Sequence, residues 1–254
     1  AILNESEQVK GEVFKPTERI KLYVLEVKDT NKGPRITVSR THPDLVKRLF
    51  ESEVAEVKDG TVEIKAIARE AGSRTKIAVY SNNPDVDPVG ACVGLNGARV
   101  NAIVSELRGE KIDIINWDEN PAYLIENALS PAKVIFVAAD EDAREAQVIV
   151  PDYQLSLAIG KEGQNARLAA RLTGYKIDIK SETQARESGL LDDLELGYEQ
   201  GFEGYAEEPF DSFSEEAGAD ENHAEEDGTA AFGDVDFAGN EAEEGLGEEN
   251  YQEQ

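Results

Sequence analysis

Two Gly-x-x-Gly tetrapeptides are the residues of this chain best suited to hold a ligand. They occupy positions 94–97 and 160–163, 66 residues apart, and each precedes apolar residues at helical spacing. Because glycine has no Cβ, such a loop can bring its backbone close to another polymer, and the helix that follows presents free N–H groups. Those groups favour phosphate. The sequence therefore predicts two loops that each contact a phosphate backbone.

Neither loop is strongly cationic. The two central residues are Leu95 and Asn96 in the first loop, and Lys161 offset by Glu162 in the second. We therefore expect backbone N–H groups, and cations on the elements after each loop, to supply the affinity; a solvated helix face or strand end is the alternative for each cation. The predicted contact residues are Gly94, Leu95, Asn96, Gly97, Arg99, Gly160, Lys161, Glu162, Gly163, Asn165, Arg167, Arg171 and Lys176.

The elements that must position these loops occur twice in the same order. Each copy predicts a helix, two strands, a second helix, the glycine loop, a third helix and a closing strand. The closing strands are nearly identical, because Lys111-Ile112-Asp113-Ile114 recurs 65 residues later as Lys176-Ile177-Asp178-Ile179. Internal duplication follows. We expect the copies to span 43–118 and 119–186.

Residues 1–42 predict a different unit. Alternating apolar and polar residues at 20–28 and 35–39, with Asn31-Lys32-Gly33-Pro34 between them, are typical of a β-hairpin. A barrel of the OB type needs five strands, and this segment offers the hairpin and a stub at 1–3. The segment therefore predicts part of such a barrel, which should not close alone. The chain begins at Ala1 and contains no Met, which suggests a fragment.

The order of elements in each copy resembles the bacterial, type II KH domain, whose Gly-x-x-Gly loop clamps single-stranded RNA. Over residues 1 to about 188 the chain also resembles the NusA family of bacterial transcription elongation and termination factors. Four segments carry this resemblance: Val38-Ser39-Arg40-Thr41-His42-Pro43, Asn83-Pro84-Asp85-Val86-Asp87-Pro88-Val89-Gly90, Ile149-Val150-Pro151-Asp152-Tyr153-Gln154-Leu155-Ser156-Leu157-Ala158-Ile159-Gly160-Lys161 and Gly163-Gln164-Asn165-Ala166-Arg167-Leu168-Ala169.

The resemblance implies an α+β fold with a partial S1 (OB-type) barrel followed by two KH domains that form one RNA-binding surface. It also implies RNA polymerase and other transcription factors as partners, in modulating pausing, termination and antitermination. Members of the family often carry a basic residue in the first loop, which this chain lacks. An S1 and KH module of an RNA-degrading complex stays an alternative, although such enzymes place the KH domain before the S1 domain.

Residues 187–254 differ in composition from the rest. They hold 24 acidic residues and no Lys or Arg, so they carry −24 of the formal charge of −27 and leave −3 on residues 1–186. Such a composition cannot offset the entropy of folding, and we expect a disordered tail. Three roles stay open for the tail: a solubiliser, a docking segment with aromatic anchors, or the functional part of an acidic interaction protein. We expect it to compete weakly with RNA for basic residues.

Other chemistry finds little support in the sequence. His42 and His223 have no metal-ligand spacing, Cys92 predicts a small buried residue, and no nucleotide-binding fingerprint occurs. We expect no catalysis, no metal and no cofactor. No apolar run is long enough to span a bilayer. We therefore expect a cytoplasmic protein without a membrane partner, and a monomer.

Overall fold

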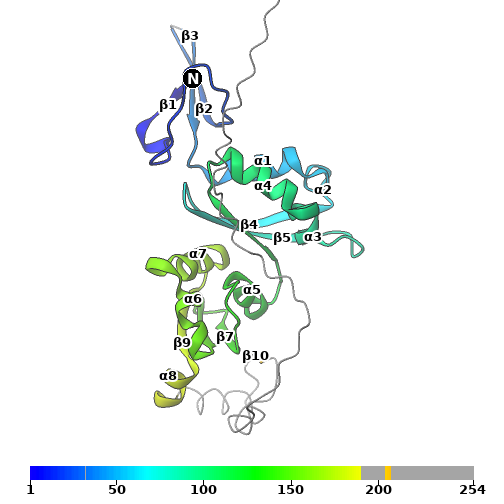
Figure 1. Ribbon diagram of the computed structural model, residues 1–254, viewed down its shortest axis with the longest axis vertical. Helices are drawn as coiled ribbons and strands as arrows, with labels where there is room; N and C mark the ends of the chain where they lie inside the picture. The colour runs from blue at the N-terminus through cyan, green and yellow to red at the C-terminus, as the bar shows by residue number, and fades with distance from the viewer. Residues whose placement is uncertain (32, 190–203, 207–254) are drawn as a thin grey trace, which may run out of the picture. The chain divides into compact units, whose positions relative to one another are not determined.

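The computed structural model describes residues 1–31, 33–189 and 204–206. At the N-terminus, β2 (Tyr23–Thr30) and β3 (Gly33–Ser39) pair antiparallel, which confirms the hairpin, and β1 (Ile2–Leu3) runs parallel to β3. A short 3-10 turn (Glu5–Glu7) follows β1. The strands lie in the order β1-β3-β2 (Figure 1). Within the described part of residues 1–42 this sheet is open, as expected of a partial barrel.

The first repeat has the predicted order of elements. They are α1 (Pro43–Glu53), α2 (Ala55–Lys58), β4 (Val62–Glu70), β5 (Arg74–Ser81), α3 (Pro88–Val93), the loop turn (Leu95–Gly97), α4 (Ala98–Glu106) and β6 (Lys111–Asn116). The sheet order is β4-β5-β6, with β4 antiparallel and β6 parallel to β5. Asp87 begins α3 by accepting hydrogen bonds from the N–H groups of Val89 and Gly90.

The second repeat has the same topology. It comprises α5 (Pro121–Ala128), β7 (Phe136–Asp140), β8 (Glu145–Val150), a 3-10 turn (Asp152–Gln154), α6 (Leu155–Ile159), the loop turn (Lys161–Gly163), α7 (Gln164–Thr173), β9 (Lys176–Ser181) and α8 (Glu182–Glu187). β7 and β8 pair antiparallel, and β8 and β9 pair parallel. The parallel pairs begin at equivalent residues, Arg74 opposite Lys111 and Glu145 opposite Lys176. The structure therefore supports the inferred duplication.

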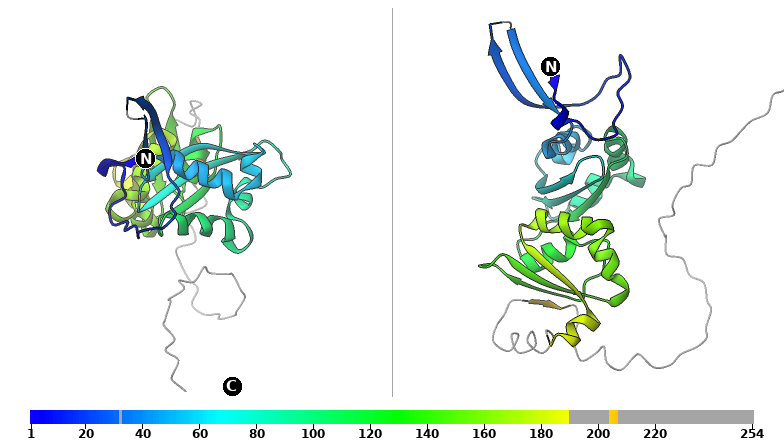
Figure 2. Two further views of the ribbon diagram at one scale, coloured as in Figure 1. Left: turned by 90° about the horizontal axis from the view of Figure 1, so that it is seen from above. Right: turned by 90° about the vertical axis from the view of Figure 1, so that its left-hand side faces the viewer.

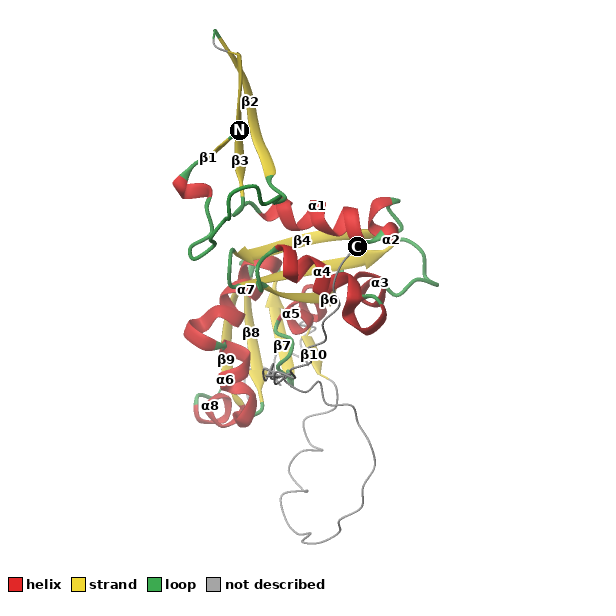
Figure 3. Ribbon diagram, turned by 45° about the horizontal axis from the view of Figure 1, so that its top comes forward, coloured by secondary structure: helices red, strands yellow, loops and turns green. Residues whose placement is uncertain are grey.

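The two repeats share a hydrophobic core. One face of the first sheet packs against α1, α3 and α4, around Phe50 and Ile77. The other face, through Ala78 and Ile115, joins a cluster that contains Ile125 of α5 and further residues of the second repeat. Figures 2 and 3 show α5 and α7 beside the first sheet, on the side away from α1. The first sheet therefore has helices on both faces.

A buried arginine joins the N-terminal segment to the first repeat. The Arg40 side chain is 1% exposed and forms ion pairs with Glu12 and with Glu106 of α4. It also donates to the backbone carbonyls of Lys21 and Glu106, both at 2.9 Å. A buried charge is stable only when it is paired and hydrogen-bonded, and this guanidinium meets that condition with groups from both sides of the junction.

The acidic segment lies mostly outside the described residues, so its expected disorder stays a prediction. Six of its residues are exceptions. Residues 187–189 form the end of α8 and the turn after it, and β10 (Gly204–Ala206) pairs antiparallel with β7 at the edge of the second sheet. The sequence pattern did not predict this strand. None of the helices in the described ranges has the length and apolar character needed to cross a membrane.

Candidate nucleic-acid interface

The two glycine loops have the same backbone conformation. Gly94 and Gly160 have φ/ψ of 75/173° and 75/171°. The third loop residue lies in the left-handed region in both copies, at 51/29° for Asn96 and 54/26° for Glu162. The closing glycine, Gly97 or Gly163, has a φ of 73° or 72°. The duplicated sequence pattern therefore corresponds to a duplicated geometry.

The first glycine of each loop is required for packing as well as for its backbone conformation. A Cβ on Gly94 would lie 2.8 Å from Cγ of Arg99, and a Cβ on Gly160 would lie 2.8 Å from Cβ and 2.9 Å from the backbone nitrogen of Asn165. Real Cβ contacts are not this short. Each loop is thus folded tightly onto the residue five positions later.

Arg99 and Asn165 hold their loops from the inside. Arg99 donates to the carbonyl of Ala91 in α3 at 2.6 Å and pairs with Glu56 of α2 at 3.0 Å. Asn165, at the equivalent position, donates to the carbonyls of Leu129 and Ala158 at 2.9 and 3.0 Å. The predicted ligand contact of Asn165 needs correction, because its side chain is only 5% exposed. Both residues support the loop backbone from behind.

The central loop residues face outward. Leu95 is 86% exposed, and Asn96, Lys161 and Glu162 are exposed as well. Since no hydrophobic partner covers Leu95, its position at the tip of the first loop leaves it available to a ligand. The surfaces of both loops are therefore accessible where the sequence predicts contact.

The cations predicted after the second loop are paired with carboxylates. Arg167 contacts Glu70 at the end of β4, at 2.6 Å, and Arg171 lies 3.5 Å from the same carboxylate. Lys176 pairs with Glu145 at 2.9 Å, and both of these side chains are exposed. Hydrogen bonds from Arg167 and Gln164 lower the pKa of Glu70 to about 2. These cations are already engaged in the free protein.

Exposed apolar residues beside the second loop are a feature that the sequence analysis missed. Tyr153, Leu157 and Ile159 are 77%, 45% and 38% exposed, on the 3-10 turn and α6 that lead into the loop. The i, i+4 spacing of Tyr153 and Leu157, with buried Ala158 turned the other way, was the available signal. Aromatic and apolar surfaces of this kind accept unstacked bases.

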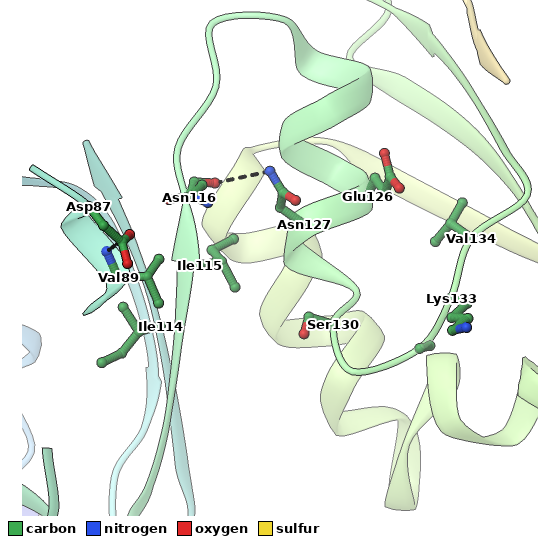
Figure 4. A pocket seen from close by; sticks show the side chains of 11 residues that line it. Asp87, Val89, Ile114, Ile115, Asn116, Glu126, Asn127, Ser130, Lys133 and Val134 are labelled. Carbon is green, nitrogen blue, oxygen red and sulfur yellow. Dashed lines mark hydrogen bonds between the residues drawn. The ribbon is translucent and has the colours of Figure 1, made fainter. Parts of the chain in front are cut away.

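A cleft of about 610 Å³ lies between the two repeats (Figure 4). On one side it is bounded by the start of α3 and the end of β6, and on the other by the end of α5 and the segment that follows. Asn127 donates to the carbonyl of Asn116 across it, at 3.3 Å. The lining residues are Asp87, Val89, Ile114, Ile115, Asn116, Glu126, Asn127, Ser130, Ala132, Lys133 and Val134.

Cys92 and His42 both have structural surroundings in the described residues. Cys92 is buried, and burial raises the pKa of its thiol to about 12, which disfavours a thiolate. His42 accepts a hydrogen bond from the N–H of Asp44 at the start of α1 and stacks on Tyr23. Among the residues that the structure describes, no group of three or more His, Cys, Asp or Glu could hold a metal.

Two α/β repeats with exposed Gly-x-x-Gly loops define the chain as a protein with tandem type II KH domains. Comparison with family models agrees, since residues 40–117 match a "NusA-like first KH domain" and residues 121–187 a "NusA-like second KH domain". The chain belongs to the NusA family. From here on, the first and second repeats are called the first and second KH domains.

Relatives with known names support this membership. A "Transcription termination/antitermination protein NusA" of Halalkalibacterium halodurans is 61% identical over 199 residues, which cover 78% of this chain and 52% of that protein. The protein of the same name in Bacillus subtilis is 63% identical over 190 residues, which cover 75% of this chain and 51% of that protein. That of Mycobacterium bovis is 57% identical over 182 residues, which cover 71% of this chain and 52% of that protein. The chain spans about half the length of these relatives.

Proposed function

We propose that the two KH domains bind single-stranded RNA, each through its Gly-x-x-Gly loop. The observation that carries this proposal is the matching backbone of the two loops, with both central pairs of residues exposed. Backbone N–H groups at the start of α4 and α7 face phosphate, while Lys161 adds charge at the second loop. Since neither loop is strongly cationic, the backbone contributes a large share of the contact.

Base contacts then fall to the surfaces beside the loops. Tyr153 and Leu157 present an exposed apolar surface before the second loop, on which a base can stack. The cleft between the KH domains, with Lys133 on its wall, adds a polar surface that both domains share. We propose that one RNA strand contacts both domains.

We further propose that this binding serves a factor that modulates pausing, termination and antitermination by RNA polymerase. The relatives' printed name, transcription termination/antitermination protein, supports this role. RNA polymerase and other transcription factors are the proposed partners, and the cytoplasm, where bacterial transcription takes place, is the proposed location. We propose a monomer that acts by binding and not by catalysis.

Acidic substitutions at the loop tips test RNA binding. Gly160 is a poor target, because a side chain there would collide with Asn165. The exposed tips avoid this problem, so the test compares the unaltered chain with a triple variant, Leu95→Asp, Asn96→Asp and Lys161→Asp. Fluorescence anisotropy with a labelled single-stranded RNA pool should show at least about tenfold weaker binding, since carboxylates then meet phosphate.

Lys47→Asp on the exposed face of α1 is the control, because it makes the same exchange of lysine for aspartate as Lys161→Asp does, but outside both loops. We expect RNA affinity near that of the unaltered chain. A folded triple variant that binds RNA as well as this control does would contradict the proposal. Assaying phosphate-dependent RNA degradation by the unaltered chain separates the alternative, an RNA-degrading module, since our proposal expects no activity.

A further inference from the structure

A single carboxylate of the first KH domain, that of Glu70, accepts hydrogen bonds from two residues near the start of α7 in the second KH domain. Oε1 of Glu70 accepts from Nε of Arg167 at 2.6 Å, and Oε2 accepts from Nη2 of Arg167 at 3.2 Å. Gln164, the first residue of α7, donates to Oε2 at 2.9 Å and to Oγ of Ser73 at 2.8 Å. Ser73 lies in the turn between β4 and β5. The contacts therefore all begin at one end of the first sheet.

Arg167 carries this connection into the second loop. Its remaining guanidinium nitrogen, Nη1, donates to the backbone carbonyl of Glu162 at 3.1 Å. A path of hydrogen bonds thus runs from Glu70 through Arg167 to the centre of the Gly-x-x-Gly turn. All three guanidinium nitrogens of Arg167 have a protein partner, although the side chain is 43% exposed.

We propose that Glu70 is a positioning residue that fixes the second Gly-x-x-Gly loop relative to the first KH domain, so that one RNA strand can engage both loops at once. This inference rests on the proposed RNA binding. In this proposal a residue outside both loops sets their spacing, and Arg167 acts mainly as the link and not as a phosphate ligand.

The physical reason is the gain from bivalency. When one loop has bound a strand, the second contact becomes intramolecular, and its strength depends on how often the second loop sits at the right distance. A loop held by a forked, charge-assisted pair samples that distance more often than a loosely held one. Loosening the link should therefore weaken the binding of long RNA strands and leave the binding of short strands unchanged.

A second interpretation of Glu70 predicts the opposite effect, because its charge offsets that of Arg167 and Arg171. If those arginines served chiefly as phosphate ligands, removal of the Glu70 charge would free them and tighten RNA binding. The geometry favours positioning, since Arg167 uses its third nitrogen on the loop carbonyl. The two interpretations thus predict changes of opposite sign.

The experiment measures affinity of the full chain for two single-stranded RNAs. The short one has about four nucleotides, the length that one KH loop clamps, and the long one about three times that length. We expect Glu70→Gln to lower the affinity for the long RNA about tenfold, and to change the affinity for the short RNA by less than about twofold. The matched control is Glu63→Gln, which removes a carboxylate from the same strand where it pairs with Lys65 inside the first domain.

Arg167→Lys separates charge from geometry, because lysine keeps the charge but cannot form the fork. We expect it to lower the affinity for the long RNA as much as Glu70→Gln does. The double variant, Glu70→Gln with Arg167→Lys, should bind the long RNA no more weakly than either single variant. Unchanged or tighter binding of the long RNA by Glu70→Gln, equal losses for both RNAs, or additive losses in the double variant would each overturn the inference. Failure of the unaltered chain to bind either RNA would instead overturn the proposed function.

Discussion

The first glycine of each loop and the residue five positions later form a matched pair in both KH domains. Arg99 and Asn165 differ in size and charge, yet each donates to a carbonyl of the preceding helix and occupies the space that a Cβ would need. The backbone at Gly94 and Gly160, with φ near 75° and ψ near 172°, is also one that other residues seldom adopt. Both constraints act on the same residue.

Alanine substitution should therefore affect the two glycines of the second loop unequally. In Gly163→Ala the new Cβ meets only Nη1 of Arg167 at 3.9 Å, so the cost is that of the left-handed conformation, about 1 kcal/mol. Gly160→Ala adds a contact of 2.9 Å with a backbone nitrogen, and should cost at least about 2 kcal/mol. Urea unfolding of both variants measures the difference.

Gly109→Ala supplies the reference for this comparison, because its φ is +92° and no atom lies within 4 Å of the added Cβ. We expect its free energy of unfolding to fall about as much as that of Gly163→Ala. Equal losses for Gly160→Ala and Gly109→Ala would mean that the close approach to Asn165 has no energetic weight.

Among the elements, the first sheet is packed against helices on both of its faces. Its second face is covered by α5 and α7 of the other KH domain, with Ile125 fully buried in the shared cluster. Burial of a whole aliphatic side chain contributes about 1.5–3 kcal/mol. The contact between the domains therefore belongs to the core of the described structure.

Truncation of that contact should destabilise both KH domains together. Ile125→Ala removes buried methyl groups and leaves a cavity, so we expect the free energy of unfolding to fall by about 2–5 kcal/mol. Hydrogen exchange should show faster exchange in β5 as well as in β8. Leu157→Ala on α6 is the control, with a far smaller effect, because that side chain is 45% exposed. Loss of protection confined to the second domain would show that the domains unfold separately.

The sequence predicted the elements well because each repeat carries its own local pattern. Strand alternation, helical spacing and the glycines that end elements can each be recognised within about a dozen residues. Because of the duplication, each pattern also occurs twice. The role of Arg167 could not be predicted in this way. Its partner Glu70 lies 97 positions earlier and meets it only because the first sheet docks on α7. Burial of Asn165 was hidden for the same reason, since its partner Leu129 lies on another element.

At the scale of the molecule, charge is distributed very unevenly, and this leads to a prediction about RNA affinity. Residues 187–206 hold six of the 24 acidic residues of the C-terminal segment. A chain that stops after Ala206 therefore loses the other 18 acidic residues and keeps β10. A tethered acidic segment has a high effective concentration near basic residues. We expect this truncation to tighten RNA binding about threefold at low salt, with the gain fading as salt shortens the Debye length.

The control for the truncation keeps the chain length and replaces the acids of residues 207–254 by their amides. If charge is responsible, this chain should match the truncated one in salt titrations of RNA affinity. Equal affinity of the full and truncated chains at low salt would leave the segment as a solubiliser or as a docking site for another protein.

The buried Arg40 has a mechanical consequence. Segments that join domains are usually exposed and swing freely, but here a guanidinium holds Glu12, Lys21 and Glu106 together at the junction. A pull or twist applied to the β2–β3 hairpin is therefore passed to α4, which starts directly after the first Gly-x-x-Gly loop. The hairpin and the helix that follows the first loop are thus coupled through Glu106, at the C-terminal end of that helix.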